Sequence, residues 1–204
     1  MEHVCLDLEG VLIPEIWAEV AEYTGEEQFK LTTQDLKDYS ELMDMRINLV
    51  ESIGLSFSEI QSLVDKMEPF DGAREFIDWV RDNFQLTIVS DSFYELAWPL
   101  LRKLGTPAIN CHYLDIENNQ LKGYTLRQLE NKKKVVQSLK DMKFKVFASG
   151  DSYNDIQMLQ EADLGVFFQA PKHIREEFKE IDGVESHADL KNLLIENSTF
   201  IGRA

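Results

Sequence analysis

Cysteine, basic charge and long apolar runs are all scarce in this chain of 204 residues. Its two cysteines, Cys5 and Cys111, have no C-x-x-C spacing, which argues against a disulfide framework and against a four-ligand zinc site. The 21 lysines and arginines stand against 37 aspartates and glutamates, and the formal charge of −16 argues against nucleic-acid or anionic-membrane partners. No run approaches the roughly 18 uninterrupted apolar residues of a membrane span, and the first residues lack a secretory pattern. We therefore expect a soluble, cytoplasmic protein without a membrane partner.

Regularly spaced apolar runs indicate the fold class. Hydrophobic residues make up 44% of the chain, enough for a sizeable core in one domain. Short runs rich in β-branched and aromatic residues, typical of strands, occur at 4–8, 86–90, 108–113, 145–149 and 164–168. Helical patterns lie between most of them, at 73–81, 94–104, 132–142 and 155–162. This alternation predicts an α/β fold with a parallel sheet covered by helices on both faces.

The first two predicted strands are separated by about 75 residues, far more than one crossover helix needs. The pattern is helical throughout 14–67, and Ser56 with Glu59 forms a capping box at the start of one helix. We therefore expect a small helical cap inserted after the first strand, over the carboxyl edge of the sheet. Residues 118–123 have the composition of a hairpin turn. The predicted organisation is a core of residues 1–13 and 71–204 with a cap of residues 14–70.

Two carboxylates close the first predicted strand. Side chains alternate along a strand, so Asp7 and Glu9 point to the same side at its carboxyl end, and Gly10 allows a sharp turn after them. Ligands of open α/β sheets bind outside the carboxyl ends of the strands. Taken alone, the motif is equally compatible with a solvated turn after a strand.

Two more acids follow the fourth predicted strand, in Gly150-Asp151-Ser152-Tyr153-Asn154-Asp155. Four acids at one sheet edge repel one another unless a cation neutralises them. Oxygen ligands without a cluster of cysteine or histidine favour Mg²⁺. Asp155 has two interpretations at this stage: a metal-site residue, either ligating or supporting, or an acid that caps the next helix.

Ser90 and Lys132 are the polar residues that could hold a phosphate at the same edge. Ser90 ends the second predicted strand, where a hydroxyl and the N–H groups of a following helix can bind an anion. Lys132 shares the inward face of its helix with Val135, Val136 and Leu139, whereas its lysine neighbours do not. Each signal alone also fits a helix cap or a solvated basic run.

Together and in this order, Asp7-x-Glu9-Gly10, Ser90, Lys132 and Gly150-Asp151-x-x-x-Asp155 resemble the four motifs of the haloacid dehalogenase-like (HAD) superfamily. The resemblance spans most of the chain. It implies that Asp7 is a nucleophile that forms an aspartyl phosphate, while the acid two residues on protonates the leaving oxygen and then activates water. That acid is usually Asp and is Glu9 here. A carboxylate at this position separates the chain from the dehalogenases, which lack one, and from the transport ATPases, which have Lys.

Glu15 and Arg46 are the informative residues of the predicted cap. Arg46 lies three residues after Met43 and four before Val50, on the apolar face of a helix that also carries Leu36. An inward arginine needs an anionic partner, either a protein carboxylate or a substrate one, and Glu15 could bind an ammonium. From the residues alone, an Arg–carboxylate pair and a first-turn Glu are the simpler explanation.

The placement of Glu15 and Arg46 resembles the phosphoserine phosphatases, in which the corresponding residues bind the amino and carboxyl groups of the substrate. Asp7-Leu8-Glu9-Gly10-Val11-Leu12 with Pro14-Glu15, and Ser90-Asp91-Ser92-Phe93, resemble more closely the branch described as bifunctional phosphoserine phosphatase and phosphoserine:homoserine phosphotransferase. Asp91 departs from ordinary phosphoserine phosphatases, which tend to have Gly there. The resemblance to this branch implies homoserine as a second acceptor of the phosphoryl group. A pocket for one amino-acid headgroup also discriminates poorly against an added methylene.

We expect a Rossmann-like HAD core acting as a Mg²⁺-dependent phosphatase on O-phospho-L-serine. The expected catalytic residues are Asp7, Glu9, Ser90 and Lys132; the expected substrate-binding residues are Glu15, Arg46, Ser90, Asp91, Lys132 and Asn154; the expected Mg²⁺ ligands are Asp7, Glu9 and Asp151.

Three alternatives remain at the level of the sequence. The substrate could be another small phosphomonoester. A receiver-type signalling domain also combines an acidic pocket, Mg²⁺, a hydroxyl and a lysine, but it lacks a cap and carries its phosphorylated Asp on the third strand. A catalytically dead binding module is disfavoured because Asp7, Glu9, Lys132 and Asp151 are all present.

Overall fold

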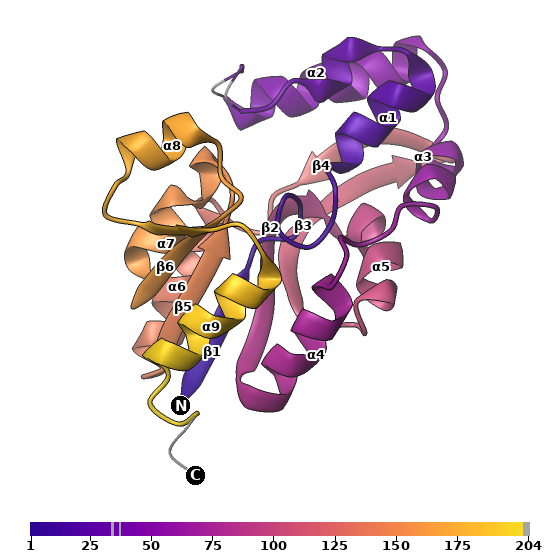
Figure 1. Cartoon of the computed structure of the whole chain (residues 1–204). Helices are drawn as coiled ribbons and strands as arrows, with labels where there is room; N and C mark the ends of the chain where they lie inside the picture. The colour runs from indigo at the N-terminus through magenta and orange to yellow at the C-terminus, as the bar shows by residue number, and fades with distance from the viewer. Residues whose placement is uncertain (34, 37, 202–204) are drawn as a thin grey trace.

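The computed structural model of the chain describes residues 1–33, 35, 36 and 38–201 (Figure 1). In that part of the chain, seven strands form one sheet in the order β4-β3-β2-β1-β5-β6-β7. All neighbouring strands are parallel except β3 and β4. The strands are β1 (Glu2–Leu6), β2 (Gln85–Phe93), β3 (Ile109–Glu117), β4 (Gln120–Thr125), β5 (Lys145–Gly150), β6 (Leu164–Phe168) and β7 (Asp182–Val184). The α-helices are α1 (Ile16–Thr24), α2 (Tyr39–Ser52), α3 (Phe57–Val64), α4 (Ala73–Asn83), α5 (Tyr94–Lys103), α6 (Asn131–Asp141), α7 (Ile156–Glu161), α8 (Lys172–Glu177) and α9 (His187–Asn197).

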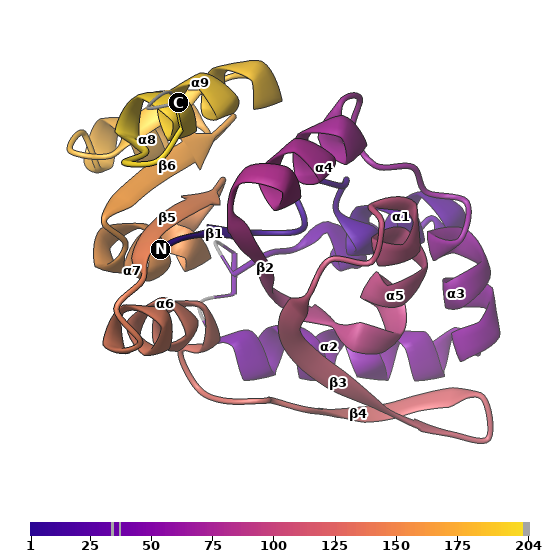
Figure 2. The same cartoon turned by 90° about the horizontal axis from the view of Figure 1, so that it is seen from below.

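Side chains that alternate along the strands belong to two separate apolar clusters, one on each face of the sheet. Val4 and Leu6 of β1 pack with α4, α5 and α9, whereas Cys5 between them packs with α6 and α7. Helices therefore cover both faces of the sheet, as Figure 2 shows for α4 on one side and α6 on the other. The α/β class and the mainly parallel sheet predicted from the sequence are confirmed.

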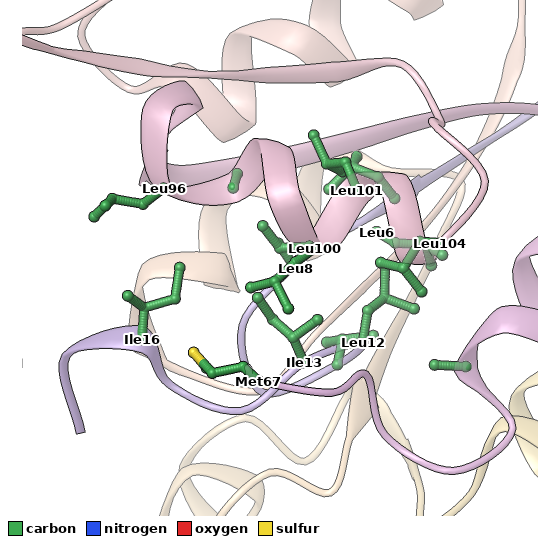
Figure 3. Close-up of a cluster of buried hydrophobic side chains, with 14 of the residues drawn as sticks. Leu6, Leu8, Leu12, Ile13, Ile16, Met67, Leu96, Leu100, Leu101 and Leu104 are labelled. Carbon is green, nitrogen blue, oxygen red and sulfur yellow. The ribbon is translucent and has the colours of Figure 1, made fainter. Parts of the chain in front are cut away.

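The helices α1, α2 and α3 follow β1 and lie beyond the carboxyl ends of the central strands (Figure 1). Their apolar side chains belong to the same cluster as α5 and β1. Figure 3 shows part of that cluster, where both ends of the helical segment meet α5: Leu6, Leu8, Leu12, Ile13, Ile16, Met67, Leu96, Leu100, Leu101 and Leu104. The segment is therefore fixed to the sheet by a shared apolar core.

Local signals inside this segment are partly confirmed. Ser56 and Glu59 form the predicted capping box of α3, with each side chain bonded to the backbone of the other. The expectation of helix throughout 14–67 is wrong in one place: 27–30 form a 3₁₀ turn, and α2 begins only at Tyr39. Leu36, expected on the helix of Arg46, precedes that helix.

The predicted hairpin turn is confirmed at one edge of the sheet: Asn118 and Asn119, with φ of 50° and 63°, connect β3 to the antiparallel edge strand β4. The strand β7 has three residues and was missed, because a run that short carries no readable alternation. No helix in the described ranges has the length and hydropathy to cross a membrane.

His3 links the two central strands at the amino end of the sheet. Its Nε2 lies 2.9 Å from the Thr87 hydroxyl oxygen of β2, and its Nδ1 is buried without a hydrogen-bond partner. Burial lowers the pKa of His3 from 6.5 to about 4.

Acid should therefore destabilise the fold through His3. Below about pH 6.5 the His3 imidazole is protonated in the unfolded chain, whereas in the folded protein it is protonated only below about pH 4. The unfolding free energy should fall by about 2 kcal/mol between pH 7.5 and pH 5 from this group, and His3→Gln should remove that part of the loss. Urea unfolding of both proteins at the two pH values measures it. An equal loss in both proteins would contradict the assignment.

Candidate active site

The carboxyl ends of β1, β2 and β5 bring the predicted site residues to one cavity. Asp7 follows β1 directly, and its backbone N–H donates to the Ser149 carbonyl oxygen of β5 at 2.9 Å. The cavity has a volume of about 160 Å³. All nine residues expected from the sequence line it: Asp7, Glu9, Glu15, Arg46, Ser90, Asp91, Lys132, Asp151 and Asn154.

A buried ion-pair cluster centres on Lys132. Its Nζ lies 2.7 Å from Asp155 Oδ1, 2.8 Å from Asp7 Oδ2 and 3.9 Å from Asp91 Oδ2. Burial alone would lower the pKa of Lys132, but the three carboxylates overcome this and raise it well above its usual value. Lys132 is therefore a fixed cation, as its spacing with the apolar residues of its helix predicted.

The carboxylates around this lysine suit a divalent cation. Asp7, Asp151 and Asp155 each offer one oxygen, and these oxygens lie within 4.8 Å of one another. Burial and the Asp155 carboxylate raise the pKa of Asp7 well above its usual range, and they raise that of Asp151 to about 7. A cation bound there would relieve this repulsion, and an all-oxygen donor set fits Mg²⁺. The donors that are present thus fit the metal that the sequence implied.

Asp155 already has protein donors on both oxygens. Besides the Lys132 contact on Oδ1, its Oδ2 accepts from the backbone N–H groups of Asp151 at 3.0 Å and Ser152 at 3.1 Å. Asp155 is fully buried and closes a capping box with Ser152. This geometry combines the two interpretations that the sequence left open: Asp155 caps the turn and also holds Lys132 and Asp151.

Glu9 and Glu15 form a second acidic pair on the α1 side of the cavity. Glu9 Oε2 accepts from the Ile16 N–H at 2.8 Å and so caps α1. Burial and the neighbouring Glu9 raise the pKa of Glu15 to about 8. The Glu9 carboxylate is outside the trio of Asp7, Asp151 and Asp155.

Arg46 is buried in the lining of the same cavity, and none of the described carboxylates forms an ion pair with it. Its Nη2 donates to the Leu31 carbonyl oxygen at 2.8 Å, and its guanidinium lies 5.0 Å from the centre of the Trp17 ring. Among the described residues, its Nε is buried without a hydrogen-bond partner and no carboxylate lies within 4.0 Å of this guanidinium. The Arg–carboxylate pair, which was the simpler explanation from the residues alone, is therefore not formed. An anionic ligand could complete it.

Ser90 and Asn154 supply uncharged polar groups near Lys132. The Ser90 hydroxyl accepts from the Ser92 N–H at 3.1 Å, and Asn154 Nδ2 donates to Asp91 Oδ2 at 3.1 Å. Ser90 was expected next to a helix N-terminus, but β2 continues to Phe93 and α5 begins only after it. The N–H groups near Ser90 therefore belong to an extended segment.

Three residues of the site region were missed as functional residues in the sequence. Trp17 and Tyr39 line the cavity, and Tyr39 donates its hydroxyl to the Asp91 carbonyl oxygen at 2.7 Å. The third is His112 of β3, whose Nε2 lies 3.6 Å from Asp91 Oδ1. Their patterns are those of core aromatics, and the one available signal was the position of Trp17 two residues after Glu15.

Comparisons with known proteins agree with this geometry. A family model described as haloacid dehalogenase-like hydrolase matches residues 1–163. The chain belongs to this family. It is 44% identical over 200 residues to the phosphoserine phosphatase ThrH of Pseudomonas aeruginosa, covering 98% of both chains. It is 43% identical over 199 residues to a phosphoserine phosphatase of Pseudomonas syringae pv. tomato, covering 97% of this chain and 84% of that one.

Solved structures share the fold of this HAD hydrolase. A phospho-aspartyl intermediate analogue of a phosphoserine phosphatase superposes with a TM-score of 0.77 at 22% identity, covering 95% of this chain and 97% of the other. A substrate-bound phosphoserine phosphatase complex gives 0.78 at 21% identity, covering 95% and 96%. The predicted HAD fold with its helical insertion is confirmed. Membership of a hydrolase family sets aside the receiver-type signalling domain.

Gly10 lies directly against the Asp151 side chain in the acidic site. It has φ of +75°, and a Cβ on it would lie 2.4 Å from Asp151 Cγ. Gly25, at the end of α1, has nearly the same φ of +76°, and a Cβ on it would have nothing within 4 Å.

Gly10→Ala should therefore displace the Asp151 carboxylate and weaken Mg²⁺ binding at least about tenfold, because divalent-cation sites depend on ligand position. Gly25→Ala imposes the same backbone strain, of order 1 kcal/mol or more, without touching the site. Isothermal titration calorimetry with Mg²⁺, alongside thermal melts, separates the two effects. Equal Mg²⁺ affinities of the two variants would show that Gly10 has only a backbone role.

Proposed function

We propose that this HAD hydrolase is a Mg²⁺-dependent phosphatase of O-phospho-L-serine that works through an aspartyl phosphate on Asp7. The observation that carries the proposal is the buried Arg46 guanidinium, whose Nε has no partner, in the cavity that also holds Asp7 and Lys132. An unsatisfied buried donor at one end and a nucleophile beside a cation at the other fit an ester with a second anionic group. The names of the curated relatives point to the same substrate.

We assign the amino-acid end of the substrate to residues 14–70, as a cap on a core of residues 1–13 and 71–204. Arg46 would hold the carboxylate through its free Nε. Glu15 would hold the ammonium group: its raised pKa reflects burial beside Glu9, and a substrate cation would relieve the repulsion between the two acids. A cavity of about 160 Å³ suits a ligand as small as an amino-acid phosphate ester.

We assign the phosphate end to Ser90, Lys132 and Asn154, which line the cavity together with Asp7; Lys132 Nζ lies 2.8 Å from Asp7 Oδ2. Lys132 would offset the negative charge of the phosphoryl oxygens while staying paired with Asp155. Asp7 and Asp151 would hold Mg²⁺, which supplies further positive charge to the transferring group. Glu9 was also expected as a Mg²⁺ ligand, but its Oε2 accepts the Ile16 N–H, so we assign Glu9 to proton transfer.

The proposed reaction has two displacements at phosphorus. In the first, an Asp7 carboxylate oxygen bonds to phosphorus while the bond to the serine oxygen breaks, and Glu9 gives that oxygen its proton. In the second, Glu9 takes a proton from water, whose oxygen bonds to phosphorus as the bond to Asp7 breaks. Serine and inorganic phosphate leave, and Asp7 and Glu9 return to their starting states. Homoserine in place of water would give phosphohomoserine by the same step, since its hydroxyl differs in reach by one methylene.

The direct test follows phosphorus NMR of the protein with phosphoserine and Mg²⁺. We expect inorganic phosphate to be released, and a chelator to stop this release. When homoserine is added, we expect phosphohomoserine to form as well. Asp7→Asn should lower turnover by several powers of ten in a protein that still folds, because it removes the nucleophile at nearly constant volume. Hydrolysis of other small phosphomonoesters in preference to phosphoserine would replace the proposed substrate. Phosphate without phosphohomoserine at any homoserine concentration would leave a plain hydrolase.

Arg46→Ala tests whether Arg46 binds the carboxylate of the substrate. It should cost about 2 to 4 kcal/mol in kcat/KM for phosphoserine, because the carboxylate loses its charged donor, and much less for an aryl phosphate without a carboxylate. Steady-state kinetics on both substrates with one enzyme preparation gives the comparison. Equal losses on the two substrates would mean that Arg46 supports the packing of α2 instead of binding the amino acid.

A further inference from the structure

The Asp91 carboxylate stands in the wall between two cavities. It lines the catalytic cavity of about 160 Å³ and also an adjoining cavity of about 790 Å³. Lys132 and Asn154 line both cavities as well, whereas Glu15 and Arg46 line only the catalytic one. The larger cavity therefore meets the catalytic one at the end that we assign to the phosphate, and Asp91 lies at that junction.

Three groups surround the Asp91 carboxylate. Its Oδ2 accepts from Asn154 Nδ2 at 3.1 Å and lies 3.9 Å from Lys132 Nζ. Its Oδ1 lies 3.6 Å from His112 Nε2, beyond hydrogen-bond distance. Burial would raise the pKa of Asp91, but Lys132, His112 and Asn154 outweigh it and lower the pKa below its usual value. Asp91 is thus an anion at neutral pH with one oxygen bonded and the other near an unused partner.

The groups that Asp91 contacts are the ones that a phosphate needs. The Asn154 amide and Lys132 are donors of the proposed phosphate site, and one of the two amide hydrogens of Asn154 is taken by Asp91. A carboxylate and a phosphate oxygen accept the same hydrogen bonds and repel each other at short range. A bound phosphate therefore competes with Asp91 for Asn154.

His112 is arranged to receive Asp91 when it leaves Asn154. Its Nδ1 accepts the Arg127 backbone N–H at 3.2 Å, which in a neutral imidazole places the proton on Nε2, the nitrogen that faces Asp91. The ring is buried, and Tyr39 packs against it edge-on with centroids 6.0 Å apart. A small rotation of the Asp91 side chain would exchange the Asn154 bond for one from His112.

We propose that Asp91 is a built-in competitor of phosphate, which weakens the grip of Lys132 and Asn154 on the inorganic phosphate product and promotes its release. This inference rests on the proposed phosphatase function. The ester substrate is also held at its amino-acid end by Arg46 and Glu15, whereas the product phosphate has contacts at the phosphate end alone. The same repulsion acts on both, but the substrate stays bound through contacts that the product lacks.

Asp91→Asn is the main test, because the amide keeps the size and hydrogen bonding of the side chain and removes its charge. We expect inorganic phosphate to bind at least about tenfold more tightly to this variant by isothermal titration calorimetry in Mg²⁺, given the strength of a like-charge contact near a protein surface. The phosphate inhibition constant, with an aryl phosphate as substrate, should fall by the same factor. The KM for phosphoserine should fall by no more than that factor.

Two further variants control the result. Glu130 lines the larger cavity but not the catalytic one. Glu130→Gln removes its negative charge, and the phosphate affinity of this variant should stay within about twofold of the native value. His112→Gln removes the imidazole that is to receive Asp91, so phosphate should bind severalfold more weakly. Thermal melts establish that each variant is folded.

Unchanged or weaker phosphate binding in Asp91→Asn would overturn the inference and would show that Asp91 helps to hold the phosphate. An equal gain in Glu130→Gln would also overturn it, because the effect would then come from overall charge. Failure of the proposed function looks different: phosphoserine would resist hydrolysis by the native protein, while the calorimetric contrast between Asp91→Asn and Glu130→Gln would still report on an anion site.

Discussion

The buried ammonium group of Lys132 is the constraint on which the site depends. It is 4% exposed and contacts carboxylates from three separate segments, Asp7 after β1, Asp91 in β2 and Asp155 after β5. A buried cation without these partners would carry a desolvation cost of several kcal/mol, and each buried carboxylate without the lysine would be as unfavourable. The three segments that carry these acids are therefore held together by ion pairs as well as by packing.

This cluster leaves the cavity strongly acidic. Asp7, Glu9, Glu15, Asp91 and Asp151 line it, with Lys132 and Arg46 as the cations. Burial and mutual repulsion raise the pKa of Asp7, Glu15 and Asp151 together. Such a site gains most from binding positive charge. In the proposed function, the Asp7 and Asp151 pair would bind a metal ion, and the Glu9 and Glu15 pair would bind a substrate ammonium.

Lys132 and Arg46, the cations among the described residues that line the cavity, are in opposite situations. Lys132 has ion-pair partners in the protein, so its position is set before any ligand arrives. Arg46 is held by a carbonyl oxygen and an aromatic face, with its Nε left unsatisfied. The apolar cluster shared by α1, α2, α3 and α5 keeps this guanidinium opposite the sheet edge. In the proposed function, a phosphate would meet the preset Lys132 and a carboxylate would complete the contacts of Arg46, which is why we propose a ligand with two anionic groups.

Local rules were enough to determine much of this protein from its sequence. Asp7 and Glu9 both line the cavity as expected, although β1 ends at Leu6 and strand alternation does not reach them. Helical spacing turned Lys132 inward, and the Ser56–Glu59 box marked the start of α3. Only the tertiary structure decided the partners: Asp155 for Lys132, the Ile16 N–H for Glu9, the Leu31 carbonyl for Arg46, and Asn154 with His112 beside Asp91. Most of these contacts join segments far apart in the chain. Which acid meets which donor depends on burial and on competition among several nearby charges, and residue spacing encodes neither.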